Sequence, residues 1–159
     1  MITLRPVTSE NFDALLALKV KDWQTKYVAS NLYSLAEAYL ALSSGETFLQ
    51  PFTIYHHKQL IGFTMYQYDQ LENSPEDAHP VYFIWRVFID KKYQGRGLGK
   101  KAMESLLAHI RTFPQGKADA VYVSYMPDNE ASKQLFASLG FKETGEMDDD
   151  EAIARYTIE

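Results

Sequence analysis

Hydrophobic and polar positions repeat along this chain with two different periods, and these periods separate the predicted strands from the predicted helices. A period of two, or a short apolar run, predicts strands at 2–7, within 51–68 (two strands joined by a polar turn), at 81–90, at 119–126 and at 152–158. The run 81–90 is almost entirely apolar, which is typical of a strand buried on both faces. Arg86 interrupts this run, so we expect it to be paired or to line a cleft.

Apolar residues recur every three or four positions in four other segments, which we predict to be helices. The clearest is 97–111, and a second, 128–139, is followed by Gly140 as its C-cap. Polar capping residues mark the starts of the other two. One runs from Thr8 or Ser9 to about Lys19, and the other from Ser34, with Glu37 in the capping-box position, to Leu42 near a stop at Gly45.

The order of these elements predicts a mixed α/β (α+β) fold: a hairpin, a central strand, a helix, a strand, a helix and a strand. The chain has 159 residues and shows no repeat, low-complexity tract or linker, so we expect one domain over residues 1–159. The acidic segment 70–80 is rich in loop-forming residues and is expected to join two strands.

Composition excludes several classes of protein. Hydrophobic residues make up 46% and aromatic residues 14% of the chain, which argues against a disordered protein. A net charge of −5 argues against a nucleic-acid binder, and the lack of a signal peptide or long apolar run predicts a cytoplasmic protein without membrane contact. There is no cysteine and the four histidines lack a metal-binding spacing, so we expect no metal.

Positive charge is concentrated around three glycines in the sequence DKKYQGRGLGKKAM, residues 90–103. The segment joins a strand to the start of an amphipathic helix, where unpaired N–H groups and the helix dipole bind phosphate oxygens. Gly95, Gly97 and Gly99 would let the backbone approach such an anion. No P-loop string is present, and Lys100 occupies the third glycine position of a dinucleotide fingerprint. The pattern indicates a pyrophosphate site, and the alternative is a glycine-rich turn before a solvated basic helix.

Two motifs in this half of the chain resemble those of the GNAT acetyltransferase superfamily. The hexad from Gln94 to Gly99 matches its Q/R-x-x-G-x-G/A signature, and NEASKQLFASLGF, from Asn129 to Phe141, resembles its second signature. The order and spacing of the two blocks also fit. The resemblance implies a mostly antiparallel mixed sheet of six to seven strands with about four helices. In that fold the fourth and fifth strands splay apart and bind acetyl-CoA between them.

The resemblance also implies roles for individual residues. Backbone groups of Phe88 and Ile89 would pair with the pantetheine arm, and the N–H of Ile89 would polarise the thioester carbonyl. Asn129 would bond the pantetheine, and Lys133 either approaches the phosphates or is a surface lysine. The acetyl-CoA residues implied in this way are Phe88, Ile89, Gln94, Gly95, Arg96, Gly97, Leu98, Gly99, Lys100, Asn129, Lys133 and Phe136.

The sequence departs from the family in its candidate acid and base. Many members carry a tyrosine where this chain has Phe136, so the thiolate would be protonated by Tyr125, Tyr122, Tyr82 or water, or would leave unassisted. Some members place a glutamate in the central strand, but residues 82–87 contain no carboxylate. By position, Asp69 and Glu72 are candidate bases, and solvated loop acids are the alternative reading.

The acceptor is inferred from acidic loops and aromatic residues. Acids gather in 69–77 and 146–151, and Trp85, Tyr66, Tyr68 and Tyr125 could add cation–π walls, so that Trp85, Asp69 and Glu72 are candidate substrate-binding residues. The chain is similar to bacterial polyamine (spermine/spermidine) acetyltransferases, which implies direct attack of a small-molecule amine on acetyl-CoA in a ternary complex. The alternatives are another small amine, a protein amine, or a catalytically silent CoA-binding module. A homodimer is compatible with this resemblance.

Overall fold

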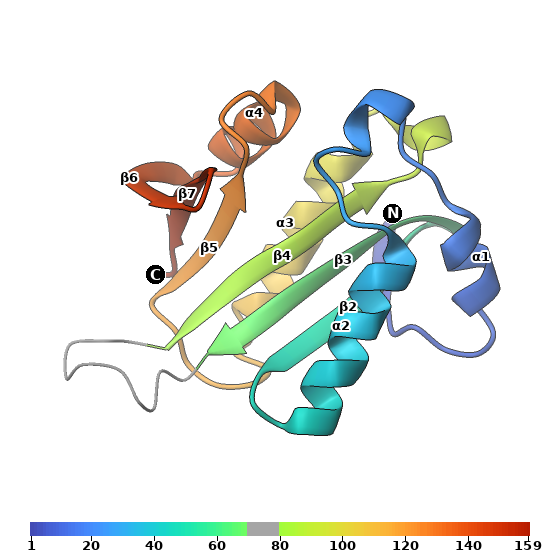
Figure 1. The fold of residues 1–159 in the computed structure, drawn as a ribbon, viewed down its shortest axis with the longest axis horizontal. Coiled ribbons are helices and arrows are strands. Elements are labelled where there is room, and N and C mark those ends of the chain that lie inside the picture. Colours follow the sequence, from blue (N-terminus) through green and yellow to red (C-terminus); the bar gives the residue numbers. More distant parts are fainter. Residues whose placement is uncertain (70–79) are drawn as a thin grey trace.

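The computed structural model describes residues 1–69 and 80–159, in which seven strands form one sheet in the order β1-β2-β3-β4-β5-β7-β6 (Figure 1). The strands are β1 (Ile2–Arg5), β2 (Phe48–His56), β3 (Gln59–Asp69), β4 (Val81–Ile89), β5 (Ala120–Tyr125), β6 (Lys142–Asp148) and β7 (Glu151–Thr157). The helices are α1 (Phe12–Ala17), α2 (Asn31–Ser44), α3 (Leu98–Ile110) and α4 (Glu130–Ser138), with short 3-10 turns at Asp22–Gln24 and Lys91–Tyr93. The acidic segment predicted as a loop, including Glu72, lies outside the described residues.

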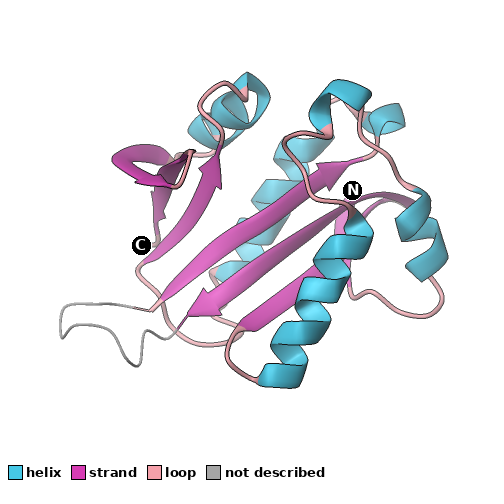
Figure 2. Ribbon diagram, in the orientation of Figure 1, coloured by secondary structure: helices cyan, strands magenta, loops and turns pink. Residues whose placement is uncertain are grey.

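The sheet is mixed and mostly antiparallel, as the sequence predicted. Each neighbouring pair is antiparallel except β4 and β5, which run parallel. Helix α3 lies behind the sheet against β1 and β4, whereas α1 and α2 cover the other face against β3 and β2 (Figures 1 and 2). Each face therefore has its own apolar cluster. The larger one surrounds α3, and the smaller one is built on Leu15, Phe63, Met65 and Phe88.

The gap between β4 and β5 has a local cause in β4. The two strands pair only from Val81–Ala120 to Ile84–Val123, although both continue further. The register of β4 against β3 then skips Trp85, which is therefore the extra residue of a β-bulge. A bulge bends its strand and increases the local twist. The bend directs the rest of β4 away from β5, and the two strands visibly diverge in Figure 1.

The structure corrects three predicted helix starts. Helix α2 begins at Asn31 and not at Ser34, because the Ser30 hydroxyl accepts the N–H of Tyr33 at 3.1 Å and acts as the cap. Helix α1 begins at Phe12, because Asn11 at its start uses its side chain to bond the Thr8 N–H and the Pro6 carbonyl. Helix α4 begins after Asn129, two residues later than predicted.

Helix ends and strands bring further corrections. Helix α1 stops at Ala17 because Leu18 is already extended, whereas the stops predicted at Gly45 and Gly140 are confirmed by their left-handed φ angles of 70° and 101°. Strand β4 is not buried on both faces, since only alternate residues before the bulge are buried. Strand β6 was missed because each of its residues is exposed, so its sequence lacks an apolar alternation.

Tyr82 ties the connection between α3 and β5 to the sheet. Its hydroxyl donates to the Gly116 carbonyl at 2.8 Å and accepts the N–H of Gln115 at 3.2 Å, while its side chain is completely buried. These bonds face away from the gap between β4 and β5, on the α3 side of the sheet. Tyr82 therefore has a structural position and does not lie where a thiolate would leave.

We expect Tyr82→Phe to lower the free energy of unfolding by about 1–2 kcal/mol, because a partly buried carbonyl and N–H lose their partner. Urea unfolding measures this difference. Tyr39→Phe is the matched control, since Tyr39 is 67% exposed on α2. Equal stability of the two variants would contradict the structural role of the Tyr82 hydroxyl.

Candidate active site

The glycine loop leads into the N-terminus of α3 with a backbone shape that suits an anion. Gly97 is the N-cap of the helix with φ of 74°, and Gly95 has φ of 78°, a region that favours glycine. The first intrahelical bond joins the Lys101 N–H to the Gly97 carbonyl. The N–H groups of the first helical turn before Lys101 therefore have no intrahelical acceptor and present the positive end of the dipole.

Gly99 differs from the other two glycines of the loop. Its φ lies outside the left-handed region, and a Cβ built there would meet only Ile89 Cγ1 at 3.7 Å, an ordinary contact. The protein itself would therefore tolerate a side chain at 99. A glycine at this position is explained by close approach of something outside the protein.

Side-chain hydrogen bonds anchor the glycine loop to the end of β4 and to the segment that follows α1. Gln94 Nε2 donates to the Ile89 carbonyl at 2.8 Å and to Gln24 Oε1 at 2.8 Å. The carboxylate of Asp90, which is 5% exposed, accepts the N–H of Lys19 at 2.8 Å. These bonds hold the segment after α1 against the loop, so residues far apart in sequence form one wall.

A cavity of about 300 Å³ opens beside this loop, between the start of α3 and α4. Arg96 and Lys100 are exposed and do not line it, although the Arg96 guanidinium lies 5.8 Å from the ring centre of Tyr93, which does. Lys133 is exposed on α4 and does not line it. The predicted acetyl-CoA residues that line it are Ile89, Gln94, Gly95, Gly97, Leu98, Gly99 and Asn129.

A second cavity, which we call the acceptor cavity, has a volume of about 510 Å³ and lies where β4 and β5 separate. Five residues line both cavities, which makes them neighbours along one groove. They are Tyr27, Val28, Val87, Asn129 and Ser132. A long ligand held at the glycine loop can therefore extend to the acceptor cavity.

The backbone of β4 fits such a ligand at Ile89. The Asp90 N–H donates to the Ile61 carbonyl of β3 at 2.8 Å, whereas the Ile89 carbonyl accepts from Gln94. Successive residues of an extended strand direct their backbone groups to opposite sides, so the Ile89 N–H points away from β3, towards the gap. The Phe88 side chain is buried in the smaller apolar cluster and lines neither cavity.

Charged side chains of both signs border the acceptor cavity. Asp148 and Glu151, from the turn between β6 and β7, contribute two carboxylates, and the Ser124 hydroxyl donates to Glu151 Oε2 at 2.7 Å. Arg86 lines the same cavity, and its Nη2 lies 2.8 Å from Glu37 Oε1 of α2. The expectation that Arg86 is paired or lines a cleft is confirmed in both parts.

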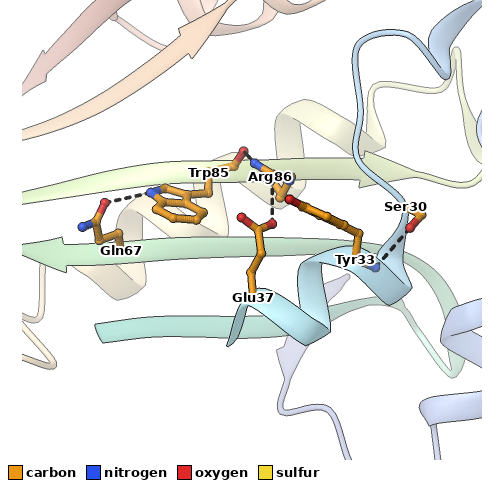
Figure 3. Close-up of polar contacts among 6 residues, drawn as sticks. All are labelled: Ser30, Tyr33, Glu37, Gln67, Trp85 and Arg86. Carbon is orange, nitrogen blue, oxygen red and sulfur yellow. Dashed lines mark hydrogen bonds and ion pairs between the residues drawn. The ribbon is translucent and has the colours of Figure 1, made fainter. Parts of the chain in front are cut away.

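Figure 3 shows how the cavity wall on β4 is held. Glu37 reaches from α2 to Arg86, and Trp85 extends along the sheet, where its Nε1 donates to Gln67 Oε1 at 2.8 Å. The bulge places Trp85 and Arg86 on the same face of β4, although they are consecutive residues. The ion pair offsets the cationic charge that Arg86 brings to the cavity.

The candidate acids occupy different environments. Tyr125 and Phe136 both line the acceptor cavity, with parallel rings whose centres are 6.3 Å apart. The Tyr125 hydroxyl donates to Glu143 Oε1 at 3.0 Å, and burial together with this carboxylate raises the pKa of Tyr125 to about 12. Tyr122 is half-buried and does not line the cavity.

Of the two candidate bases from the sequence, only Asp69 is among the described residues. Asp69 ends β3 opposite Val81, at the closed end of the gap, and does not line the acceptor cavity. Glu72 lies outside the described residues. Trp85, by contrast, lines the cavity as the sequence led us to expect.

Several residues of the groove carried no recognised signal in the sequence. Tyr27 and Val28 lie in the connection between α1 and α2, where apolar positions show no period. Ser124 lies within a predicted strand, where nothing in the sequence distinguishes it from its neighbours. Proximity to the glycine loop in the fold is what identifies them.

Residues 1–69 and 80–159 lack two further kinds of feature. Within this part of the chain, no helix is both long and apolar enough to cross a membrane. The same residues contain no group of three or more His, Cys, Asp or Glu side chains arranged to hold a metal ion.

Comparison with known proteins identifies the family. A model described as the acetyltransferase (GNAT) family matches residues 11–141. The chain is 31% identical over 151 residues to a probable spermine N(1)-acetyltransferase of Bacillus subtilis subsp. natto, covering 92% of this chain and 91% of the relative. It is 30% identical, with the same coverage, to the spermine/spermidine N(1)-acetyltransferase of Bacillus subtilis strain 168.

Solved structures share the fold. Aminoglycoside acetyltransferase AAC(6')-Ib in complex with coenzyme A superposes with a TM-score of 0.76 at 18% identity, over 99% of this chain and 95% of that one. Spermidine N-acetyltransferase from Vibrio cholerae, in complex with CoA and spermine, gives 0.71 at 16% identity with the same coverage.

The chain therefore belongs to the GNAT acetyltransferase family. It is an N-acetyltransferase that takes its acetyl group from acetyl-CoA. The fold class predicted from the sequence, including the open sheet, is confirmed.

Proposed function

We propose that the acceptor of this enzyme is a polyamine such as spermidine or spermine. The observation that carries this proposal is the pair of carboxylates, Asp148 and Glu151, on the acceptor cavity, which adjoins the cavity at the glycine loop. A polyamine carries several positive charges at neutral pH, so one nitrogen can react while the others remain near carboxylates. The relatives named as spermine and spermidine acetyltransferases support the same acceptor.

The groove also supports direct transfer of the acetyl group from bound acetyl-CoA to the amine. The pyrophosphate of acetyl-CoA binds the N–H groups of the first turn of α3, and the pantetheine extends along β4 past Asn129. The Ile89 N–H donates a hydrogen bond to the thioester oxygen as negative charge develops on that oxygen. The amine in the acceptor cavity then attacks the carbonyl directly in a ternary complex. This order requires no covalent acetyl-enzyme.

The groups around Arg86 favour a cationic acceptor over an anionic one. An unpaired guanidinium on the cavity wall would repel an ammonium group and attract a carboxylate. In this structure Glu37 lies 2.8 Å from it, so the net charge of the pair is close to zero. The remaining charges on the wall are the carboxylates of Asp148 and Glu151.

Release of free CoA thiol with spermidine, spermine, butylamine, amino acids and peptides as acceptors tests this proposal. At low salt we expect kcat/KM for spermidine to exceed that for butylamine at least tenfold, because only spermidine carries distal charges. Attraction between separated charges is screened over about 10 Å at 0.1 M salt, so added salt should raise KM for spermidine more than for butylamine. Butylamine as good as spermidine at low salt would refute the polyamine acceptor.

A further inference from the structure

A hydrogen bond joins Tyr125, a residue that lines the acceptor cavity, to the exposed side chain of Glu143. Tyr125 is 5% exposed and lines the cavity, and its hydroxyl donates to Glu143 Oε1 at 3.0 Å. Glu143 lies on β6, where each residue is exposed, and it does not line the cavity. The Tyr125 hydroxyl is thus a buried group in contact with a carboxylate that solvent reaches.

Packing fixes the direction of this hydroxyl. The Tyr125 ring lies parallel to that of Phe136 within 2°, and Phe136 in turn packs edge-on against Phe141 with ring centres 5.2 Å apart. Burial and the Glu143 carboxylate raise the pKa of Tyr125 to about 12. Tyr125 therefore keeps its proton at neutral pH, donates it towards Glu143, and retains oxygen lone pairs that can accept a hydrogen bond.

The reaction needs a route for protons out of the cavity. An amine with a pKa near 10 is neutral in only about one molecule in a thousand at pH 7. Strand β4 has no carboxylate to deprotonate it. The other charged groups that border the cavity are Asp148 and Glu151 from the β6–β7 turn and Arg86, which is paired with Glu37, whereas α4 contributes only uncharged side chains.

We propose that Tyr125 and Glu143 form the path by which the reacting amine loses its proton. The ammonium N–H bond breaks as its proton moves to Tyr125 Oη, and the original Tyr125 O–H bond breaks as that proton moves to the Glu143 carboxylate. The nitrogen keeps the electron pair and attacks the acetyl carbonyl. Glu143 then releases its proton to solvent, which restores both side chains.

This path assigns the two residues different functions. Tyr125 is the catalytic residue that contacts the amine, and Glu143 is the base that acts through it. Neither residue needs to ionise alone against its environment, because Tyr125 gains one proton while it loses another. The path serves any amine acceptor, so it rests on the acetyltransferase activity and not on the choice of a polyamine.

The test compares the pH dependence of kcat/KM between pH 6 and 10 for Tyr125→Phe, Glu143→Gln and the double variant, with both spermidine and butylamine. Glutamine can still accept the Tyr125 hydrogen bond but cannot take its proton. We expect kcat/KM of each single variant to be at least tenfold below that of the wild type at pH 7. Near pH 10, where the solution supplies neutral amine, kcat/KM should approach the wild-type value. The double variant should be no slower than Tyr125→Phe, since the two residues act in series.

Glu146→Gln is the matched control, because Glu146 is another exposed glutamate of β6. It should behave like the wild type at each pH. If kcat/KM falls by the same factor at every pH, the pair only supports packing and the proposed path is wrong. The path is also wrong if Glu143→Gln and Glu146→Gln have the same kcat/KM. Equal rates for spermidine and butylamine would refute the polyamine acceptor alone, because the pH profile still reports on the path.

A second measurement needs no acceptor. In the free protein, Glu143→Gln should lower the pKa of Tyr125, because it removes a negative charge next to the hydroxyl. NMR titration of ring-labelled tyrosine follows this pKa, with Tyr125→Phe used to assign the signal. An unchanged Tyr125 pKa would show that the pair does not form in solution and would overturn the proposal.

Discussion

Gly99→Glu should lower the affinity for acetyl-CoA at least tenfold, which corresponds to about 1.4 kcal/mol, while the fold remains intact. The substitution places a side chain and a negative charge next to the N–H groups that would hold the pyrophosphate. The fold should survive because a Cβ at Gly99 meets only Ile89 Cγ1 at 3.7 Å and the φ angle there is not left-handed. Calorimetric titration with acetyl-CoA measures the affinity, and circular dichroism checks the fold.

Position 99 gives a cleaner test than position 97. Gly97 has a φ of 74°, so a side chain there would strain the backbone and confuse a loss of binding with a loss of structure. Ala108→Glu is the matched control, since it adds the same charge to an exposed position of α3 about 13 Å further along the helix. If Gly99→Glu and Ala108→Glu bind acetyl-CoA equally well, the glycine loop does not hold the pyrophosphate.

The geometry of the glycine-loop half of the groove could be predicted from the sequence because its determinants are local. The glycine loop, the preceding strand and the following helix are consecutive, and the groups that would hold the pyrophosphate belong to the backbone of this segment. Gly97 as N-cap of α3 and Asn129 as N-cap of α4 both follow from short-range hydrogen-bond chemistry. Such patterns are visible within a window of about ten residues.

The acceptor half could not be predicted in this way because its determinants are pairs that lie far apart in sequence. Glu37 was read as part of a capping box with Ser34, but its carboxylate pairs with Arg86, 49 residues away. The bulge at Trp85 depends on the register against β3, which no property of the β4 sequence reveals. The partner of Tyr125, Glu143, lies on an edge strand whose exposed side chains gave no strand pattern.

In the acidic turn between β6 and β7, the sequence likewise does not reveal which single residue lines the acceptor cavity. The three consecutive aspartates at 148–150 are equivalent in sequence, yet only Asp148 lines the acceptor cavity. The turn geometry separates them, since Asp149 occupies a left-handed conformation with φ of 50° between the two strands. A run of like charges in sequence can therefore combine one residue of a site with neighbours that only contact solvent.

Replacing the two cavity carboxylates together, in Asp148→Asn with Glu151→Gln, should raise KM for spermidine about tenfold at low salt and leave kcat nearly unchanged. Each carboxylate contributes up to about 1 kcal/mol at such a partly exposed site, and two of them account for a factor of this size. Glutamine at 151 retains an oxygen that can accept the Ser124 hydroxyl, so the cavity wall should keep its shape. Steady-state kinetics at low and high salt measure the change.

The control for this variant is Asp149→Asn with Asp150→Asn, which removes the same charge from the same turn without touching the cavity wall. It should change KM for spermidine far less, and KM for butylamine should respond little to either pair. If the two pairs raise KM for spermidine equally, the turn acts through its total charge, which steers the acceptor from a distance. A KM that neither pair changes would show that the carboxylates of this turn do not bind the acceptor, and the cationic selectivity would then have to come from another part of the groove.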